Sequence, residues 1–115
     1  MSAHPVAMFD VTSPDPARAA TFYAELFGWG AGPEFDGYRL LDTGAEVGAA
    51  VGPSYGPGDL GVKVYMRVDD LAASIARAVR LGGAEVVPPS DLPEGYGRFA
   101  VVADLDGFAV GLWSA

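Results

Sequence analysis

The chain has 115 residues, half of them hydrophobic and 19% charged, which suits one folded domain with a buried core. It has no cysteine and a single histidine, His4, so disulfides, thiolate metal sites and most histidine chemistry are excluded. Its net charge of −8 would repel a nucleic acid and attract a cationic ligand. Because no apolar run reaches the roughly 20 residues that span a bilayer and no basic, apolar leader begins the chain, we expect a cytoplasmic protein with no membrane or nucleic-acid partner.

The first half of the chain predicts a strand, a helix and three further strands. Asp15 followed by Pro16 is typical of a helix start, and Gly28 is typical of a helix end. The apolar face of this helix is predicted to consist of Ala19, Phe22, Tyr23, Leu26 and Phe27. Strands are predicted at Val6–Val11, in a short stretch within 29–35, at Tyr38–Asp42 and at Glu46–Val51, with a turn at 43–45.

The second half repeats this order after a segment rich in Gly and Pro. Asp69 or Asp70 is expected to cap its helix, and Gly82-Gly83 to end it. The apolar face of that helix is predicted to be Leu71, Ile75, Ala78 and Val79. Strands are predicted at Val62–Val68, Ala84–Val87, Arg98–Ala103 and Phe108–Trp113, with a loop at 88–95 and a turn at 104–107.

Short matches between the halves support an internal repeat. Leu26-Phe27-Gly28 matches Leu81-Gly82-Gly83, and the segment 42–48 matches 105–111. We therefore predict one domain, 1–115, made of a first βαβββ module (5–52), a linker (53–61) and a second βαβββ module (62–114). The predicted class is α+β: a curved mixed sheet with its helices outside and an open concave cleft, where a ligand would bind.

Five motifs stand in the order found in a known family. They are Phe22-Tyr23-x-x-Leu26-Phe27-Gly28-Trp29, Val68-Asp69-Asp70-Leu71, Leu81-Gly82-Gly83, Gly97-Arg98-Phe99-Ala100-Val101 and Asp104-x-Asp106-Gly107. Over residues 5–114 the chain resembles the vicinal oxygen chelate superfamily, which includes glyoxalase I, bleomycin-resistance proteins and extradiol dioxygenases. The resemblance implies paired βαβββ modules, often completed by homodimerisation. It does not fix a function, because members isomerise, cleave rings, transfer thiols or sequester drugs.

The metal ligands of the enzymes in this superfamily come from four strands of the concave face and are usually His or Glu. The resemblance places these positions at Met8, Gly48, Lys63 and Gly111. Glycine has no side chain, a thioether is a poor ligand for a hard cation, and an ammonium group repels one. His4 precedes Met8 by four residues and is expected at the surface. We therefore expect no metal and no cofactor.

Strand alternation predicts which side chains face the cleft. The predicted ligand-binding residues are Met8, Asp10, Glu46, Gly48, Lys63, Tyr65, Gly111 and Trp113, with Ala50, Arg67 and Ala109 on the same face. Glycine floors and aromatic walls predict a pocket for a flat, partly apolar molecule. Alternation leaves open on which face five residues near the cleft lie: Tyr38, Tyr55, Tyr96, Arg98 and Phe99.

Lys63, the only lysine, has two interpretations. Its ammonium could replace the charge of the metal and bind a carboxylate, phenolate or enolate oxygen. Alternatively, it forms an ion pair with Asp10 or Glu46. Those two carboxylates could themselves act as an acid–base pair.

The leading functional hypothesis is a metal-independent, glyoxalase-like protein that binds a small, partly aromatic or carbonyl-containing molecule, with drug sequestration as one form of it. The alternatives are a cofactor-free isomerase, lyase or epimerase that uses Lys63 or a cleft carboxylate, a metal-dependent lyase or dioxygenase if the ligand positions are mapped wrongly, and a non-catalytic interaction subunit. The resemblance implies a homodimer. Six of the seven basic residues are arginine, a bias typical of GC-rich bacterial genomes.

Overall fold

The computed structural model describes residues 3–54 and 61–115, and it confirms the predicted α+β class. The elements are β1 (Val6–Thr12), α1 (Pro16–Phe27), β2 (Gly30–Phe35), β3 (Tyr38–Asp42), β4 (Gly48–Gly52), β5 (Val62–Arg67), α2 (Leu71–Arg80), β6 (Ala84–Asp91), the short 3₁₀ turn η1 (Pro93–Gly95), β7 (Arg98–Ala103) and β8 (Ala109–Ser114). Most of the predicted linker, and Tyr55 with it, lies outside the described residues.

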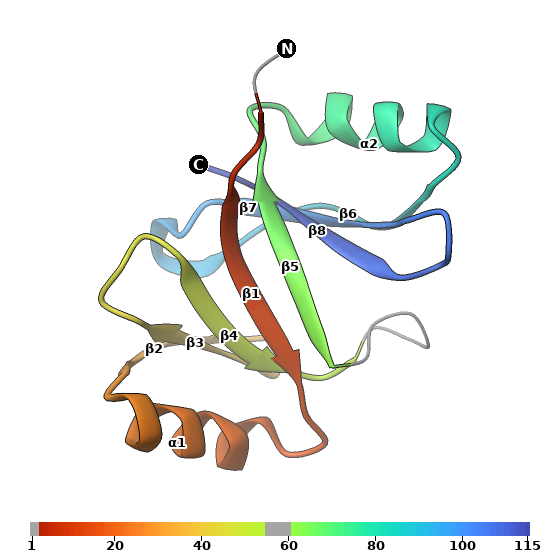
Figure 1. Ribbon diagram of the computed structural model, residues 1–115. Coiled ribbons are helices and arrows are strands. Elements are labelled where there is room, and N and C mark those ends of the chain that lie inside the picture. The colour runs from red at the N-terminus through yellow and green to blue at the C-terminus, as the bar shows by residue number, and fades with distance from the viewer. Residues whose placement is uncertain (1–2, 55–60) are drawn as a thin grey trace.

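The strands form one sheet in the order β2-β3-β4-β1-β5-β8-β7-β6. β1 and β5 run antiparallel at its centre, and each has a parallel neighbour, β4 beside β1 and β8 beside β5. This symmetry about the central pair is what an internal repeat produces. The sheet is strongly curled, with α1 and α2 at its opposite ends (Figure 1). None of the helices described is long and apolar enough to cross a membrane.

The two helices begin where the sequence predicts. The Asp15 side chain accepts a hydrogen bond from the Arg18 backbone N–H at 3.2 Å, and Asp70 does the same for Ala73 at 3.0 Å. These caps satisfy amide groups that have no partner within the first helical turn. Gly28 ends α1 in the left-handed conformation, with φ of 72°, as predicted.

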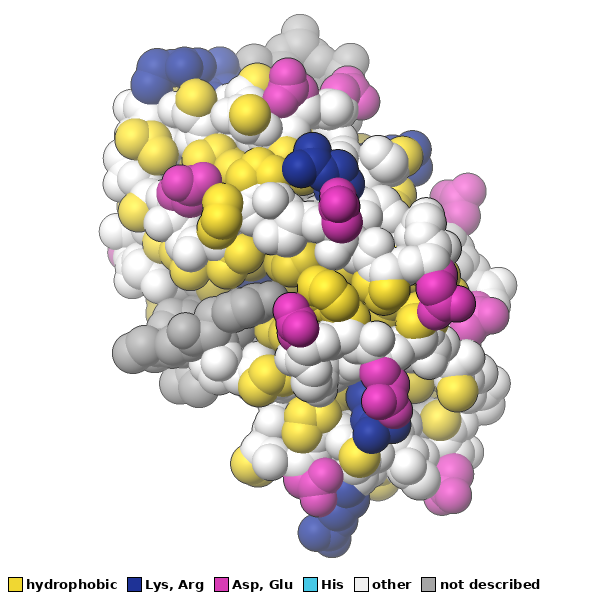
Figure 2. Space-filling model, turned by 180° about the vertical axis from the view of Figure 1, so that it is seen from behind, with side chains coloured by type: hydrophobic (Ala, Val, Ile, Leu, Met, Phe, Trp, Pro, Cys, Tyr) yellow, Lys and Arg dark blue, Asp and Glu magenta, His cyan; other side chains and the backbone are white. Residues whose placement is uncertain are grey.

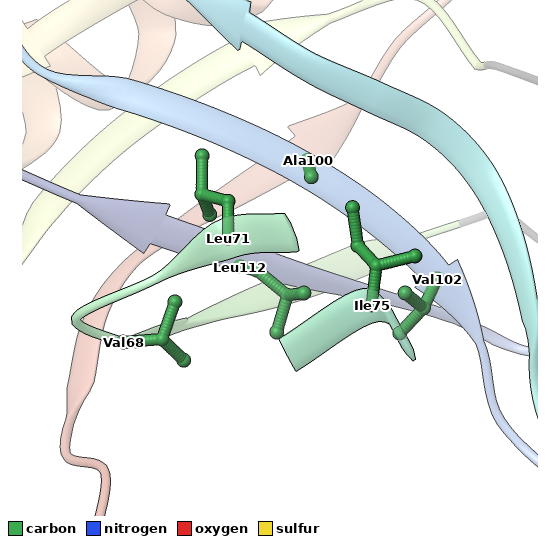
Figure 3. Packing of buried hydrophobic residues seen from close by; sticks show 6 residues of the cluster. All are labelled: Val68, Leu71, Ile75, Ala100, Val102 and Leu112. Carbon is green, nitrogen blue, oxygen red and sulfur yellow. The ribbon is translucent and has the colours of Figure 1, made fainter. Parts of the chain in front are cut away.

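Each helix packs on the outer face of its own half of the sheet. In the second half, Leu71 and Ile75 of α2 point toward strands β7 and β8 (Figure 3). The buried residues of that cluster are Val68, Leu71, Ile75, Ala100, Val102 and Leu112. In the first half, α1 packs mainly through Ala20 against Leu41 and its buried neighbours on β4. The two half-cores therefore leave the inner face of the sheet for a separate set of side chains.

The predicted apolar face of α1 is wrong for three of its five residues. Phe22, Leu26 and Phe27 are 60%, 59% and 57% exposed. The helix instead turns its small residue, Ala20, onto the sheet, which brings the helix close to the strands. Tyr23 stays partly buried and stacks against Phe27 at a centroid distance of 6.4 Å. The three exposed side chains form an apolar patch on the outside of the molecule, here named the α1 patch.

Two strand boundaries also differ from prediction. β6 continues through Pro88 and Pro89, where a loop was predicted, because it is an edge strand with register shifts and does not need every backbone N–H. β4 begins at Gly48 and not at Glu46. The turn before it is held by side chains: Thr43 Oγ1 donates to the Val47 carbonyl at 2.7 Å. Glu46 is therefore an exposed turn residue.

The concave face is partly filled by the chain itself. The Phe35 ring on β2 meets the Phe99 ring on β7 edge to face, with centroids 6.1 Å apart, and Phe99 contacts Tyr65 at 6.5 Å. The sheet curls so far that β2 also contacts η1. From behind, hydrophobic side chains gather in a band across the middle of the molecule, with acidic side chains around it (Figure 2). Only part of the predicted cleft is therefore open to a ligand.

Candidate functional site

An open groove of about 510 Å³ lies on the concave side, at the end of the sheet where β1 begins. Its lining includes Met8 of β1, Gly48 of β4, Arg67 of β5, Trp113 of β8 and Tyr96 of the segment before β7. The volume lies within the range of small-molecule pockets, and the combination of apolar walls with a few charged groups is typical of them.

Trp113 forms one wall of the groove and is held in place by two contacts, one to its indole N–H and one to its ring. Its indole N–H donates a hydrogen bond to the Tyr96 carbonyl at 2.9 Å. The Arg67 guanidinium carbon lies 5.3 Å from the centroid of the Trp113 ring, a cation–π contact. The backbone of Arg67 is fixed in turn, because its N–H donates to the Pro5 carbonyl at 2.7 Å. His4 is exposed, as predicted, and its Nδ1 lies 3.1 Å from the Arg67 carbonyl.

A second, inner pocket of about 20 Å³ lies deeper on the concave side, with room for about one water molecule. Asp10, Tyr65 and Phe99 are among its lining residues. Met8 lines both the groove and this pocket, so its side chain stands between them. A ligand of more than a few atoms fits the groove alone.

Lys63, Asp10 and Tyr65 form a buried polar cluster beside the inner pocket. Lys63 Nζ lies 3.5 Å from Asp10 Oδ2, and Tyr65 donates its hydroxyl hydrogen to the same oxygen at 2.8 Å. The exposed fractions of Lys63, Asp10 and Tyr65 are 2%, 1% and 4%. Of the two interpretations of Lys63, the ion pair with Asp10 is therefore the one observed. A molecule in the groove has no direct access to the ammonium group, because Lys63 lines neither pocket.

The four positions that the family resemblance assigns to metal ligands hold residues that do not suit a metal ion in this chain. Met8 offers a thioether, and the Lys63 ammonium is paired with Asp10. A Cβ on Gly111 would lie 2.2 Å from the Tyr65 ring, so that ring occupies the place of a ligand side chain. Across the described ranges 3–54 and 61–115, no three His, Cys, Asp or Glu side chains converge on a common point.

The structure distributes the predicted ligand-binding residues over three places. Met8, Glu46, Gly48 and Trp113 line the groove, and Met8, Asp10 and Tyr65 line the inner pocket. Lys63 and Gly111 line neither. Glu46 reaches the groove from the turn and not from a strand. It is not paired with Asp10, because Asp10 is opposite Ala50 within β4, whereas Glu46 lies in the turn before β4.

The residues near the cleft whose face the sequence did not determine lie in different places. Tyr38 and Phe99 line the inner pocket, while Tyr96 lines the groove. Arg98 points elsewhere and pairs with Asp91 at 3.0 Å.

Sequence reasoning missed Phe35 and Leu92, which close over the concave side. Phe35 carries a usable signal, because it pairs with Tyr38 across the β2–β3 hairpin and paired residues share a face. Leu92 carries no such signal, because it follows the end of the edge strand β6 and no strand alternation applies there.

Comparison with known proteins identifies the family. The pattern of the glyoxalase-like domain family matches residues 7–112. The chain is 36% identical over 126 aligned residues to "Anthracycline biosynthesis protein DnrV" of Streptomyces peucetius, covering 93% of this chain and 46% of that protein. It is 33% identical over 115 residues to "Putative glyoxylase CFP32" of Mycobacterium bovis, covering 92% of this chain and 44% of that protein. The chain thus spans less than half the length of these relatives.

Solved structures share the fold at low sequence identity. The Mn(II)-bound glyoxalase of Novosphingobium aromaticivorans superposes with a TM-score of 0.72 at 21% identity, over 95% of this chain and 37% of that one. Methylmalonyl-CoA epimerase of Mycobacterium tuberculosis gives 0.71 at 18% identity, over 99% and 92%. The TM-scores establish a common architecture, and sequence identities this low do not establish a common reaction. By its family match and its two-module sheet, the chain belongs to the glyoxalase-like domain family of the vicinal oxygen chelate superfamily.

Proposed function

We propose that this protein binds a planar, partly aromatic small molecule in the groove, without a metal ion. The observation that carries the proposal is the open groove of about 510 Å³ with Trp113 fixed as one wall. An aromatic wall that is already oriented can take a flat ligand without a further loss of side-chain freedom. The Streptomyces relative supports this class of ligand by its name, because anthracyclines are planar polycyclic aromatic compounds.

Metal independence is part of the proposal, and the donor chemistry of the four positions supports it. The ammonium of Lys63 is held against Asp10, and the Tyr65 ring covers Gly111. A divalent ion would have to displace both arrangements to gain a thioether ligand from Met8. Binding of the organic ligand, by contrast, requires neither buried group to move, because the groove is already open.

The first test is a thermal-shift titration with 9-anthracenemethanol, a neutral planar aromatic, and separately with Mn²⁺, Ni²⁺ and Zn²⁺. We expect the aromatic compound to raise Tm with concentration, because a ligand of the folded state stabilises it by about 2.7 kcal/mol at a hundredfold excess over Kd. The compound should be recovered unchanged. Specific stabilisation by a metal at near-stoichiometric concentration would contradict metal independence.

The two tryptophans provide a matched control for the binding site. Trp113 lines the groove, whereas Trp29 packs beside α1 among Phe9, Tyr23 and Phe27. The bound compound should quench tryptophan emission more strongly in Trp29→Phe, where Trp113 at the groove is the reporter, than in Trp113→Phe, where the more distant Trp29 is the reporter. Quenching that is equal in the two variants, or stronger in Trp113→Phe, would place the ligand outside the groove.

A cofactor-free isomerase, lyase or epimerase is the second candidate function. One observation favours it: the Tyr65 hydroxyl donates a hydrogen bond to the Asp10 carboxylate at the inner pocket, and these two groups are suited to acid–base chemistry. Exchange of the α-hydrogen of (R)-mandelate for deuterium during incubation with the protein in D₂O would support this candidate in place of simple binding.

We also propose that the protein is a cytoplasmic homodimer formed through the α1 patch, which consists of Phe22, Leu26 and Phe27. Three large apolar side chains more than half exposed on one helix are unusual for a surface without a partner. The relatives support a second copy of this domain as the occupant, because more than half of each lies outside the matched part, enough for another domain of this size.

Gel filtration with light scattering tests the dimer. We expect twice the 11.9 kDa of one chain for the wild type and a monomer for the double variant Phe22→Ser, Leu26→Ser. The control is Leu105→Ser, Phe108→Ser, which removes two apolar side chains near the β7–β8 turn that are even more exposed, at 75% and 64%. A monomeric wild type, or equal dissociation in both variants, would contradict this interface.

A further inference from the structure

Arg67 differs from the other cations of the described chain in its position. It is the cation that lines the groove among the residues the structure describes. Two other arginines are paired with carboxylates, Arg39 with Glu34 and Arg98 with Asp91. Arg67 pairs with an aromatic ring, although the chain has 15 acidic residues. The three remaining arginines, Arg18, Arg77 and Arg80, lie on the helices and do not line the groove.

The cation–π contact of Arg67 with Trp113 leaves hydrogen-bonding capacity for a ligand. Such a contact uses the positive charge of the guanidinium and does not consume its N–H donors. Those donors form a planar fork that matches the two oxygens of a carboxylate. The Trp113 ring is held by its hydrogen bond to the Tyr96 carbonyl, and the Arg67 backbone is held by its hydrogen bond to the Pro5 carbonyl. Both partners of the cation–π contact are therefore anchored beside the groove.

The two sides of the groove have opposite charges. Asp42 and Glu46 line the groove from the β3–β4 side, and β1 separates them from Arg67 on β5. An anionic group is therefore favoured beside Arg67 and disfavoured on the far side. Between the two sides lie Met8 and Gly48, an apolar floor without a bulky side chain at position 48.

We propose that the ligand of the groove is an aromatic carboxylic acid, with its carboxylate on Arg67 and its ring plane along Trp113 and Met8. This rests on the proposed function, that the groove binds a planar aromatic molecule. It runs against the net charge of −8, which favours cations over the surface as a whole. The local guanidinium outweighs that field, because charge-assisted hydrogen bonds act at contact distance and the distant charges are screened by salt.

The test compares three fluorescent probes of one shape: 9-anthracenecarboxylate, 9-anthracenemethanol and 9-(aminomethyl)anthracene. Fluorescence anisotropy gives the Kd of each at about 0.15 M salt, where screening acts over about 8 Å. We expect the carboxylate to bind about tenfold tighter than the alcohol, and the ammonium compound to bind weakest. Arg67→Gln should remove that advantage, so that the carboxylate and the alcohol bind the variant with equal Kd.

Arg39→Gln is the matched control, because Arg39 lies outside the groove and pairs with Glu34. It should alter no Kd. If the alcohol binds and the carboxylate binds no better, or if Arg67→Gln weakens all three probes equally, the carboxylate assignment is overturned while the aromatic-binding function stands. If none of the three probes binds, the proposed function fails, and the assignment falls with it.

Discussion

Replacing Lys63 by methionine is expected to lower the free energy of unfolding by about 3–5 kcal/mol. The ammonium group lies 3.5 Å from Asp10 Oδ2, and both side chains are at most 2% exposed. Methionine keeps most of the volume of the lysine stem, so little of the loss would come from a cavity. The loss would come from the Asp10 carboxylate, which stays buried without its cationic partner.

Urea unfolding of four proteins measures this effect: the wild type, Lys63→Met, Asp10→Asn and the double variant. We expect the double variant to lose clearly less than the sum of the two single losses, because the second substitution removes a charge whose partner is already gone. Arg39→Met is the matched control, since its pair with Glu34 is 40% and 63% exposed and should be worth no more than about 1 kcal/mol. Additive losses for Lys63 and Asp10 would show that the pair is not coupled.

The elements of the fold could be predicted because local signals of different kinds agree. Asp15 with Pro16, and Gly28 at the other end, determine the limits of α1 through hydrogen bonds and backbone geometry within a few residues. The internal repeat then predicts how the two modules are arranged, which no single element does. The modules join in one sheet through their first strands, β1 and β5. Where a boundary was wrong, as at Glu46, the cause was a short side-chain contact, the hydrogen bond from Thr43 to the Val47 carbonyl.

The candidate site was predicted less well, because alternation determines the face of a side chain and not its depth. Lys63 and Arg67 share one face of β5, yet Lys63 is 2% exposed and Arg67 is open to the groove. Lys63 lies against Asp10 and the Tyr65 ring, and the inner face next to Tyr65 is covered where Phe35 meets Phe99. That contact joins residues 64 positions apart in the chain. No local pattern in the sequence predicts it.

The second large effect is expected at Gly111, where alanine should lower the free energy of unfolding by about 1–3 kcal/mol. A Cβ at this position would lie 2.2 Å from the Tyr65 ring, and the ring has little freedom to move. Its hydroxyl donates to Asp10 at 2.8 Å, and its edge packs against Phe99. The Tyr65 ring therefore leaves no room for a side chain at this position.

Gly48→Ala is the control, because its Cβ would make only an ordinary contact, 3.5 Å from the Met8 Cβ. We expect it to be neutral or to stabilise by about 0.4–1 kcal/mol, since alanine restricts the unfolded chain. The changes in the free energy of unfolding, measured by thermal and urea unfolding, should therefore differ between the two variants in sign or clearly in size. In a Tyr65→Phe background the ring loses its hydrogen bond to Asp10 and can shift, so Gly111→Ala should cost less there than in the wild type. An equal cost in both backgrounds would mean that the hydroxyl does not hold the ring, and that packing against Phe99 alone keeps residue 111 without a side chain.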